Sequence, residues 1–253
     1  MRFLTILALS LIATTSAASA ARGECVVLLH GLARTDNSMR ILQEVLEYHN
    51  YTVINNGYPS DDGPISDLTR HVGEAAAECG DDRLNFVTHS LGGILVRAWL
   101  AQGIPDNLGR VVMLAPPNHG SEIVDTLAES DLMRRISTWL NGPATQELGT
   151  GQQSVPNTLP AVNFELGVIA GNVPINPFGT IVIDGPNDGT VSVQSTMIEG
   201  MRDHIVINAT HTLIMINPIA MAEVLEFLRN GVFDHGITLP GALRKLARPW
   251  PIR

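Results

Sequence analysis

Short runs of apolar residues alternate along the chain with stretches in which apolar residues recur every three or four positions. A continuous apolar run is typical of a strand buried on both faces of a sheet, and one lies at 25–29; further short strands are predicted at 51–55, 84–89, 111–114, 164–170 and 205–207. Helical spacing predicts amphipathic helices at 36–50, 65–76, 94–102 and 220–229. Strands that alternate with helices predict a three-layer α/β domain with a mainly parallel sheet.

This alternation breaks between Ser121 and Pro160. The segment holds two short helical patterns, at 122–129 and 131–140, and then a stretch rich in Gly, Gln and Pro. A connection of about forty residues without a strand is longer than an ordinary loop. We expect an insertion over one end of the sheet at 121–160; a decorated surface loop is the alternative.

The first twenty residues have the layout of a signal peptide. Arg2 precedes a short apolar run at 3–13, and small residues follow, ending with Ala18-Ser19-Ala20. A membrane anchor is the alternative, but a spanning helix needs about 20 apolar residues and this run is shorter. The pattern predicts cleavage after Ala20 and export to the periplasm or the medium, with no transmembrane segment in the mature chain.

Composition narrows the classes of function. The 253 residues are 45% hydrophobic and 16% charged, which is typical of a globular protein and not of a disordered one. The net charge is −9, and no basic stripe interrupts the mature chain, so a nucleic-acid binder is excluded as an interpretation. The two cysteines are too few for a Cys-only zinc site. We expect no metal and no cofactor.

Candidate chemistry begins where the 84–89 run ends, at Thr88-His89-Ser90-Leu91-Gly92. Ligands bind beyond the carboxyl ends of strands in an open parallel sheet. A serine on a tight strand-to-helix turn has its hydroxyl exposed, and small residues on either side let strand and helix approach closely. Thr88 stands where Gly is usual. We predict that Ser90 is a nucleophile; a structural cap serine is the alternative.

A serine nucleophile needs a neighbouring base and a group that orients the base. Asp188 lies in a glycine-bounded turn after the fifth apolar run, and His211 follows the sixth. Asp184 is a rival for the acid, both aspartates could be plain turn residues, and His119 is an alternative base. The chain order serine, acid, histidine is that of one particular fold.

With these motifs the chain resembles the α/β-hydrolase superfamily, and within it the bacterial secreted lipase-like serine esterases. The resemblance rests on the following segments: His30-Gly31-Leu32, Thr88-His89-Ser90-Leu91-Gly92-Gly93, Ala115-Pro116-Pro117-Asn118-His119-Gly120-Ser121, Asn187-Asp188-Gly189-Thr190-Val191 and His211-Thr212. It implies an α/β-hydrolase fold with a reduced, mainly parallel six-stranded sheet and helices on both faces. The expected division is a signal peptide at 1–20, a hydrolase domain at 21–230 and a C-terminal tail at 231–253.

The resemblance also implies roles for individual residues. The N–H groups of Leu32 and Leu91 would form the oxyanion hole. Residues expected to line or adjoin the substrate pocket are His30, His89, His119, Leu132 and Trp139. Leu132 and Trp139 belong to an apolar stripe of the insertion, which would form a wall of the acyl pocket or merely extend the core. We expect His204 to cap the sixth strand, and His49, His71 and His235 to lie at the surface.

A disulfide between Cys25 and Cys79 is also expected. Export permits the bond, and the strands next to the two cysteines are neighbours in the resembled fold. Two buried thiols are the alternative.

Together these features predict a serine hydrolase that cleaves carboxylic esters through an acyl-enzyme intermediate. The substrate would be a small-molecule or lipid ester with an apolar acyl chain. A thioesterase or phospholipid deacylase would use the same groups, and a non-catalytic binding protein on a hydrolase scaffold is the alternative from another class. The pattern predicts neither the acyl-chain length and head group nor the oligomeric state.

Overall fold

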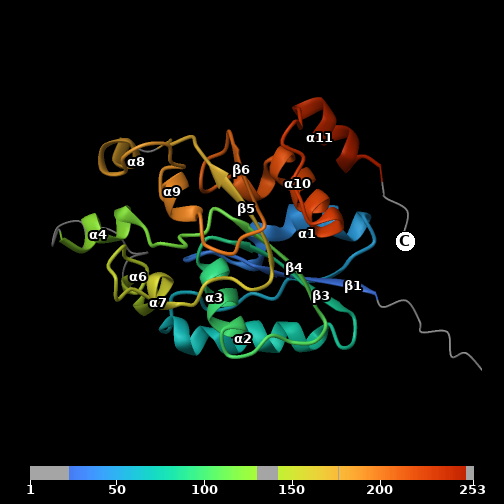
Figure 1. The fold of residues 1–253 in the computed structure, drawn as a ribbon, viewed down its shortest axis with the longest axis horizontal. Coiled ribbons are helices and arrows are strands. Elements are labelled where there is room, and N and C mark those ends of the chain that lie inside the picture. The colour runs from blue at the N-terminus through green and yellow to red at the C-terminus, as the bar shows by residue number, and fades with distance from the viewer. Residues whose placement is uncertain (1–22, 130–141, 176, 249–253) are drawn as a thin grey trace, which may run out of the picture.

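A computed structural model describes residues 23–129, 142–175 and 177–248, and it is built around one six-stranded sheet (Figure 1). All neighbouring strands are parallel, in the order β2-β1-β3-β4-β5-β6. The strands are β1 Glu24–Leu29, β2 Thr52–Ile54, β3 Arg83–His89, β4 Leu108–Leu114, β5 Glu165–Gly171 and β6 Asp203–Ile207. The predicted parallel α/β architecture, with six strands at the predicted places, is therefore confirmed.

Helices cover both faces of the sheet because each strand is apolar on both sides. On one face, Val27 and Phe86 pack with α2 and α3; on the other, Val26 and Val87 pack with α1 and α10. The larger helices are α1 Arg40–Tyr48, α2 Ile65–Glu78, α3 Leu91–Leu100, α4 Glu122–Glu129, α10 Pro218–Asn230 and α11 Leu239–Leu246. The shorter elements are η1 Asp36–Met39, α6 Pro143–Gln146, α7 Val155–Thr158, α8 Pro177–Val182, α9 Val193–Thr196 and η3 Ile214–Ile216.

The start of α3 differs from the prediction in a way that matters for function. Helical spacing predicts a start at residue 94, whereas the helix begins at Leu91, directly after the β3 strand. Gly92 and Gly93 hide the start, since glycine weakens a helical pattern. The strand and the helix are therefore joined by a single residue, Ser90.

The segment 121–160 contains α4, as the pattern at 122–129 predicts, and then α6 and α7, which the pattern does not predict. The predicted helix at 131–140, with Leu132 and Trp139, lies outside the described residues. One hydrogen bond closes the segment on itself, from the Ser121 N–H to Leu148 O, and another attaches it to α2, from the Ile65 N–H to the carboxylate of Glu147.

The predicted C-terminal tail contains α11, which packs on α10 (Figure 1). Lys245 of α11 lies 2.7 Å from Glu226 of α10. His49, predicted at the surface, is buried because the end of α11 covers it and its Nε2 lies 3.3 Å from Leu246 O. The helix begins with Leu-Pro-Gly, which weakens its helical pattern, so the sequence does not predict α11. The burial of His49 beneath α11 could therefore not be predicted either.

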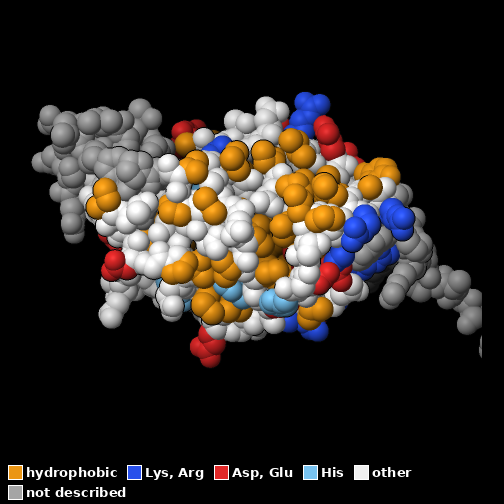
Figure 2. All heavy atoms as spheres, turned by 90° about the horizontal axis from the view of Figure 1, so that it is seen from above, with side chains coloured by type: hydrophobic (Ala, Val, Ile, Leu, Met, Phe, Trp, Pro, Cys, Tyr) orange, Lys and Arg blue, Asp and Glu red, His pale blue; other side chains and the backbone are white. Residues whose placement is uncertain are grey.

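Several apolar side chains stay exposed on the side of the molecule that carries β6, α8 and α11 (Figure 2). They include Val206 of β6, Ile181 of α8 and both Leu239 and Leu243 of α11. The described sheet ends at β6, and Val206 is 42% exposed there. None of the described helices is long and apolar enough to cross a bilayer.

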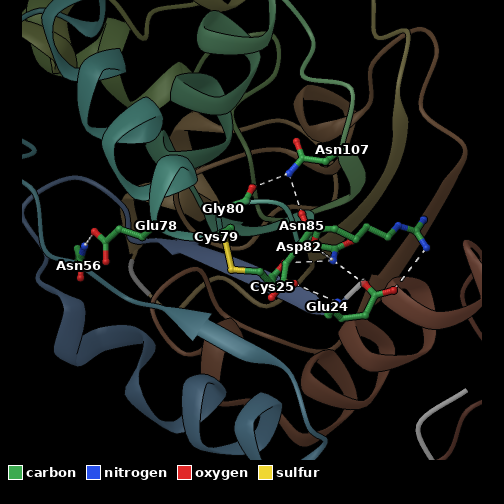
Figure 3. Close-up of a disulfide and its surroundings, with 11 residues drawn as sticks. Glu24, Cys25, Asn56, Glu78, Cys79, Gly80, Asp82, Asn85 and Asn107 are labelled. Atoms are coloured by element: carbon green, nitrogen blue, oxygen red, sulfur yellow. Dashed lines mark hydrogen bonds and ion pairs between the residues drawn. A yellow bond between two sulfur atoms is a disulfide. The ribbon is translucent and has the colours of Figure 1, made fainter. Parts of the chain in front are cut away.

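The Cys25–Cys79 disulfide is present and joins β1 to the end of α2, with 5.7 Å between the Cα atoms (Figure 3). Polar groups fix the surrounding turn: Asn107 donates to the carbonyls of Gly80 and Asp82, and the Gly23 N–H donates to Asp82. Cys25 is the second residue of β1, so the bond lies at the end of the sheet opposite to Ser90.

Candidate active site

Ser90 forms the whole turn between β3 and α3, with φ of 53° and ψ of −122°. A non-glycine residue rarely adopts this conformation, and such strained positions cluster at functional sites. The Ser90 N–H donates to Leu114 O of the neighbouring strand, and the Ser90 carbonyl accepts from Gly93. The predicted nucleophile is thus held on a turn that projects its side chain from the carboxyl edge of the sheet.

The tightness of this turn depends on glycines on its helical side. A Cβ atom at Gly92 would lie 2.6 Å from Leu29 O, which excludes any side chain. A Cβ atom at Gly93 would lie 3.3 Å from the hydroxyl oxygen of Thr88, which is fully buried. Met113 Sδ and Pro116 Cβ would lie closer still, at 3.1 and 3.2 Å, so Gly93 lets the start of α3 pack closely on these neighbours and on Thr88.

The structure brings His211 and Asp188 to Ser90. His211 Nε2 lies 3.1 Å from Ser90 Oγ, and His211 Nδ1 lies 2.7 Å from Asp188 Oδ2. The His211 N–H also donates to Asp188 O. Asp184, the rival acid, is exposed. The side chains of these three residues therefore lie in the order serine, histidine and aspartate.

The carboxylate of Asp188 is 1% exposed and held by its own turn. Its Oδ1 accepts from the N–H groups of Thr190 and Val191, at 3.0 and 2.8 Å. Oδ2 is then directed at the imidazole. Asn187 closes the turn by accepting from the Gly189 N–H. This arrangement fixes the direction in which the carboxylate acts on His211.

The predicted oxyanion donors flank Ser90. Leu91 is the first residue of α3, so its N–H has no acceptor within the helix and lies at the positive end of the helix dipole. Leu32 follows the carboxyl end of β1, the strand next to β3, and lines the same cavity as Ser90. Both N–H groups therefore lie at the carboxyl edge of the sheet, one at the start of α3 and the other in the loop after β1.

His30 adjoins the cavity without being part of its described lining. Its imidazole is fully buried beneath the loop, 2.8 Å from Gly31 O through Nδ1 and 3.4 Å from the Tyr58 N–H through Nε2. Burial lowers the pKa of His30, which favours the neutral ring. The Gly31 carbonyl requires a donor, so the proton is on Nδ1 and Nε2 accepts.

His89 lines the cavity and contacts the backbone of His211. Its Nε2–H donates to His211 O at 2.9 Å, and burial lowers its pKa well below the usual value. Nδ1 is then unprotonated and faces Gly31, where an added Cβ would lie 2.8 Å away. His89 therefore acts in packing, as expected for a residue beside the nucleophile.

The cavity at Ser90 has a volume of about 370 Å³. Its walls combine apolar side chains with hydroxyls: Leu32, Ala33, Arg34, His89, Ser90, Pro117, Ser121, Val124, Thr145, Leu148, Thr190, Val191, His211 and Thr212. His119 is absent from this lining because its side chain is exposed and bonded to Asn157, which corrects the prediction.

Sequence reasoning missed two arginines. Arg34 follows the oxyanion loop and lines the cavity. Arg97 of α3 is 4% exposed and donates to both oxygens of Asn118 and to Pro156 O. Burial lowers the pKa of Arg97 to about 10. Arg97 ties α3 to the loop after β4 and to the insertion. The sequence feature that could have identified Arg97 is a charged residue within an otherwise apolar helix.

Comparisons with known proteins agree with this architecture. The lipase BlEst2 from Bacillus licheniformis, in its mature form, is 21% identical over 83% of this chain and 93% of its own, with a TM-score of 0.66. The phospholipase PlaB from Legionella pneumophila is 19% identical over 88% of this chain and 62% of its own, with a TM-score of 0.62.

The metagenomic carboxyl esterase MGS0156 is 20% identical over 89% of this chain and 76% of its own, with a TM-score of 0.58. At such identities these three structures show a shared fold. No curated protein matched in sequence. The sequence profile of the alpha/beta hydrolase fold matches residues 24–150, half of the chain. The chain therefore belongs to the α/β-hydrolase family.

Proposed function

We propose that this protein is a serine hydrolase that cleaves carboxylic esters through an acyl-enzyme intermediate. The observation that carries the proposal is the continuous chain of contacts from Ser90 to His211 to Asp188, at 3.1 and 2.7 Å, beside an open cavity. A base within hydrogen-bonding distance activates a serine hydroxyl, and a carboxylate orients that base.

The reaction follows from these positions. Ser90 Oγ attacks the ester carbonyl while His211 Nε2 accepts the hydroxyl proton, and Asp188 stabilises the imidazolium that forms. The Leu32 and Leu91 N–H groups stabilise the oxyanion, and each such donor contributes about 3 kcal/mol. His211 then donates the proton to the leaving alcohol. Water attacks the acyl-serine by the same route and releases the acid.

An apolar acyl chain fits the described walls of the cavity. Val124 and Leu148, both from the insertion, and Val191, from the turn after Asp188, provide apolar surface beside Ser90. The insertion at 121–160 thus acts as one wall of the acyl pocket. The neighbours named lipase, phospholipase and carboxyl esterase support an ester as the substrate class.

Export belongs to the same proposal. The disulfide between Cys25 and Cys79 requires an oxidising compartment to persist, which agrees with a leader at 1–20 that is removed at Ala20.

The decisive experiment combines a fluorophosphonate probe with 4-nitrophenyl esters of increasing chain length. The wild type should be labelled and should hydrolyse the esters, and Ser90→Ala should lose both. Ser66→Ala, an exposed serine on α2, is the matched control and should retain both. Absence of labelling and turnover in the folded wild type would support the non-catalytic binding protein instead.

A further inference from the structure

Arg34 introduces a positive charge into a cavity whose other described lining residues carry no fixed charge. The chain as a whole is acidic, with 16 basic and 25 acidic residues. No aspartate or glutamate belongs to the described lining. The local charge is therefore opposite in sign to that of the protein.

The guanidinium of Arg34 makes no hydrogen bond or ion pair with any described residue. In contrast, Arg97 and Arg110 bind carbonyl or carboxylate oxygens of the protein. The nearest acidic residue in sequence, Asp36, packs beside Gly57 and does not line the cavity. Among the described residues the donors of Arg34 are thus without a partner, and a guanidinium forms strong, two-pronged hydrogen bonds with oxyanions.

The backbone before Arg34 supports a functional role. Ala33 has φ of 50°, in the left-handed region that alanine avoids. This kink lies between Leu32, the predicted oxyanion donor, and Arg34, and all three residues line the cavity. The charge of Arg34 also acts on His89, the neighbour of the nucleophile, where it adds to the effect of burial in lowering the pKa.

We propose that Arg34 binds an anionic group, a carboxylate or a phosphate, on the alcohol part of the ester. The apolar residues of the insertion take the acyl chain, and the loop after β1 supplies the cation. The preferred substrate is then an amphiphile with an apolar acyl chain and an anionic alcohol. This inference rests on the proposed ester hydrolysis at Ser90 and names the class of substrate for that site.

Matched ester pairs test the proposal. One pair is phenyl butyrate and 4-butyryloxybenzoate, which differ by a carboxylate; the other is 1-octanoylglycerol and its 3-phosphate. The readout is the ratio of kcat/KM for the anionic ester to that for the neutral ester. We expect this ratio to fall about tenfold in Arg34→Gln and to be partly restored in Arg34→Lys. The pair with the larger change identifies carboxylate or phosphate as the preferred group.

Arg40→Gln is the matched control, because Arg40 is an exposed arginine on α1 paired with Glu44. It should leave the ratio unchanged. High salt should reduce the ratio in the wild type more than in Arg34→Gln, since screening weakens an exposed charge pair. An equal ratio in the wild type and Arg34→Gln for both pairs would overturn this inference. Failure of the proposed function would differ, since neutral and anionic esters alike would then resist hydrolysis.

Discussion

The hydroxyl of Tyr58 donates a hydrogen bond to the carbonyl oxygen of His30, with 2.6 Å between the two oxygens. The two rings also stack, with centroids 4.2 Å apart. His30 in turn donates to Gly31 O. In a trans peptide the C=O and the following N–H point in opposite directions. The contact to Gly31 O therefore sets the direction of the Leu32 N–H, the proposed oxyanion donor.

Tyr58→Phe should lower kcat about tenfold with a smaller change in KM, because an oxyanion donor acts mainly in the transition state. The protein should also lose about 1–3 kcal/mol of stability, since the His30 carbonyl is left buried without its donor. Initial rates on a 4-nitrophenyl ester and urea unfolding measure the two effects. Tyr48→Phe removes an exposed hydroxyl that donates to Ala247 O and is the control. A normal kcat in Tyr58→Phe would show that Tyr58 does not support the oxyanion loop.

Asp188→Asn should reduce kcat by about four orders of magnitude while the protein stays folded. The amide of an asparagine in this turn would donate a hydrogen bond to His211 Nδ1. The imidazole proton would then be on Nε2, the nitrogen that must be unprotonated to accept the proton of Ser90. Discontinuous activity assays at high enzyme concentration would measure the residual rate, and circular dichroism would measure whether the variant is folded. Asp184→Asn changes an exposed neighbour in the same segment and should retain activity. If Asp184→Asn is the inactive variant, the acid is misassigned.

Glu223→Gln should change how stability depends on pH. Glu223 of α10 is fully buried, its Oε2 accepts from the Asp234 N–H, and burial raises its pKa to about 7. Between the unfolded pKa of 4.5 and this value, the folded protein binds more protons than the unfolded chain. Its contribution to the free energy of unfolding therefore falls as pH rises through that window and is constant above it.

Glutamine does not titrate, so the variant lacks this decrease. The difference in free energy of unfolding between variant and wild type should therefore rise by about 2–3 kcal/mol from pH 5 to pH 8. Urea unfolding at several pH values measures the difference. Glu199→Gln, an exposed glutamate, should run parallel to the wild type. A constant offset between Glu223→Gln and the wild type at all pH values would contradict the prediction.

Replacing Cys25 and Cys79 together by alanine should lower stability by about 2–4 kcal/mol, because the bond closes a long loop in the unfolded chain, with a sequence separation of 54. Turnover at 25 °C should persist, since the bond lies at the end of β1 remote from Ser90. Thermal unfolding with and without dithiothreitol tests this: the reductant should lower the midpoint of the wild type and leave the variant unchanged. Loss of activity in the folded variant would show that the bond shapes the site.

The sheet could be predicted because its strands are short segments rich in apolar residues and bounded by turn residues, as at 25–29. Ser90, Asp188 and His211 could be named because each follows such a segment. Tyr58 could not, because its role depends on a contact with His30, 28 residues earlier. His49 was assigned wrongly for a similar reason: its cover, α11, lies 197 residues away in the sequence. Local patterns carry no information about such contacts.

The backbone of Ser90 has a consequence for selection. With φ of 53°, any residue other than glycine is strained at this turn, at a cost of about 1–3 kcal/mol. A library screened only for thermal resistance should therefore enrich Ser90→Gly, and a library screened for turnover should never contain it. Stability and the proposed activity therefore oppose each other at this one position, because glycine relieves the strain and removes the hydroxyl that the proposal assigns as the nucleophile.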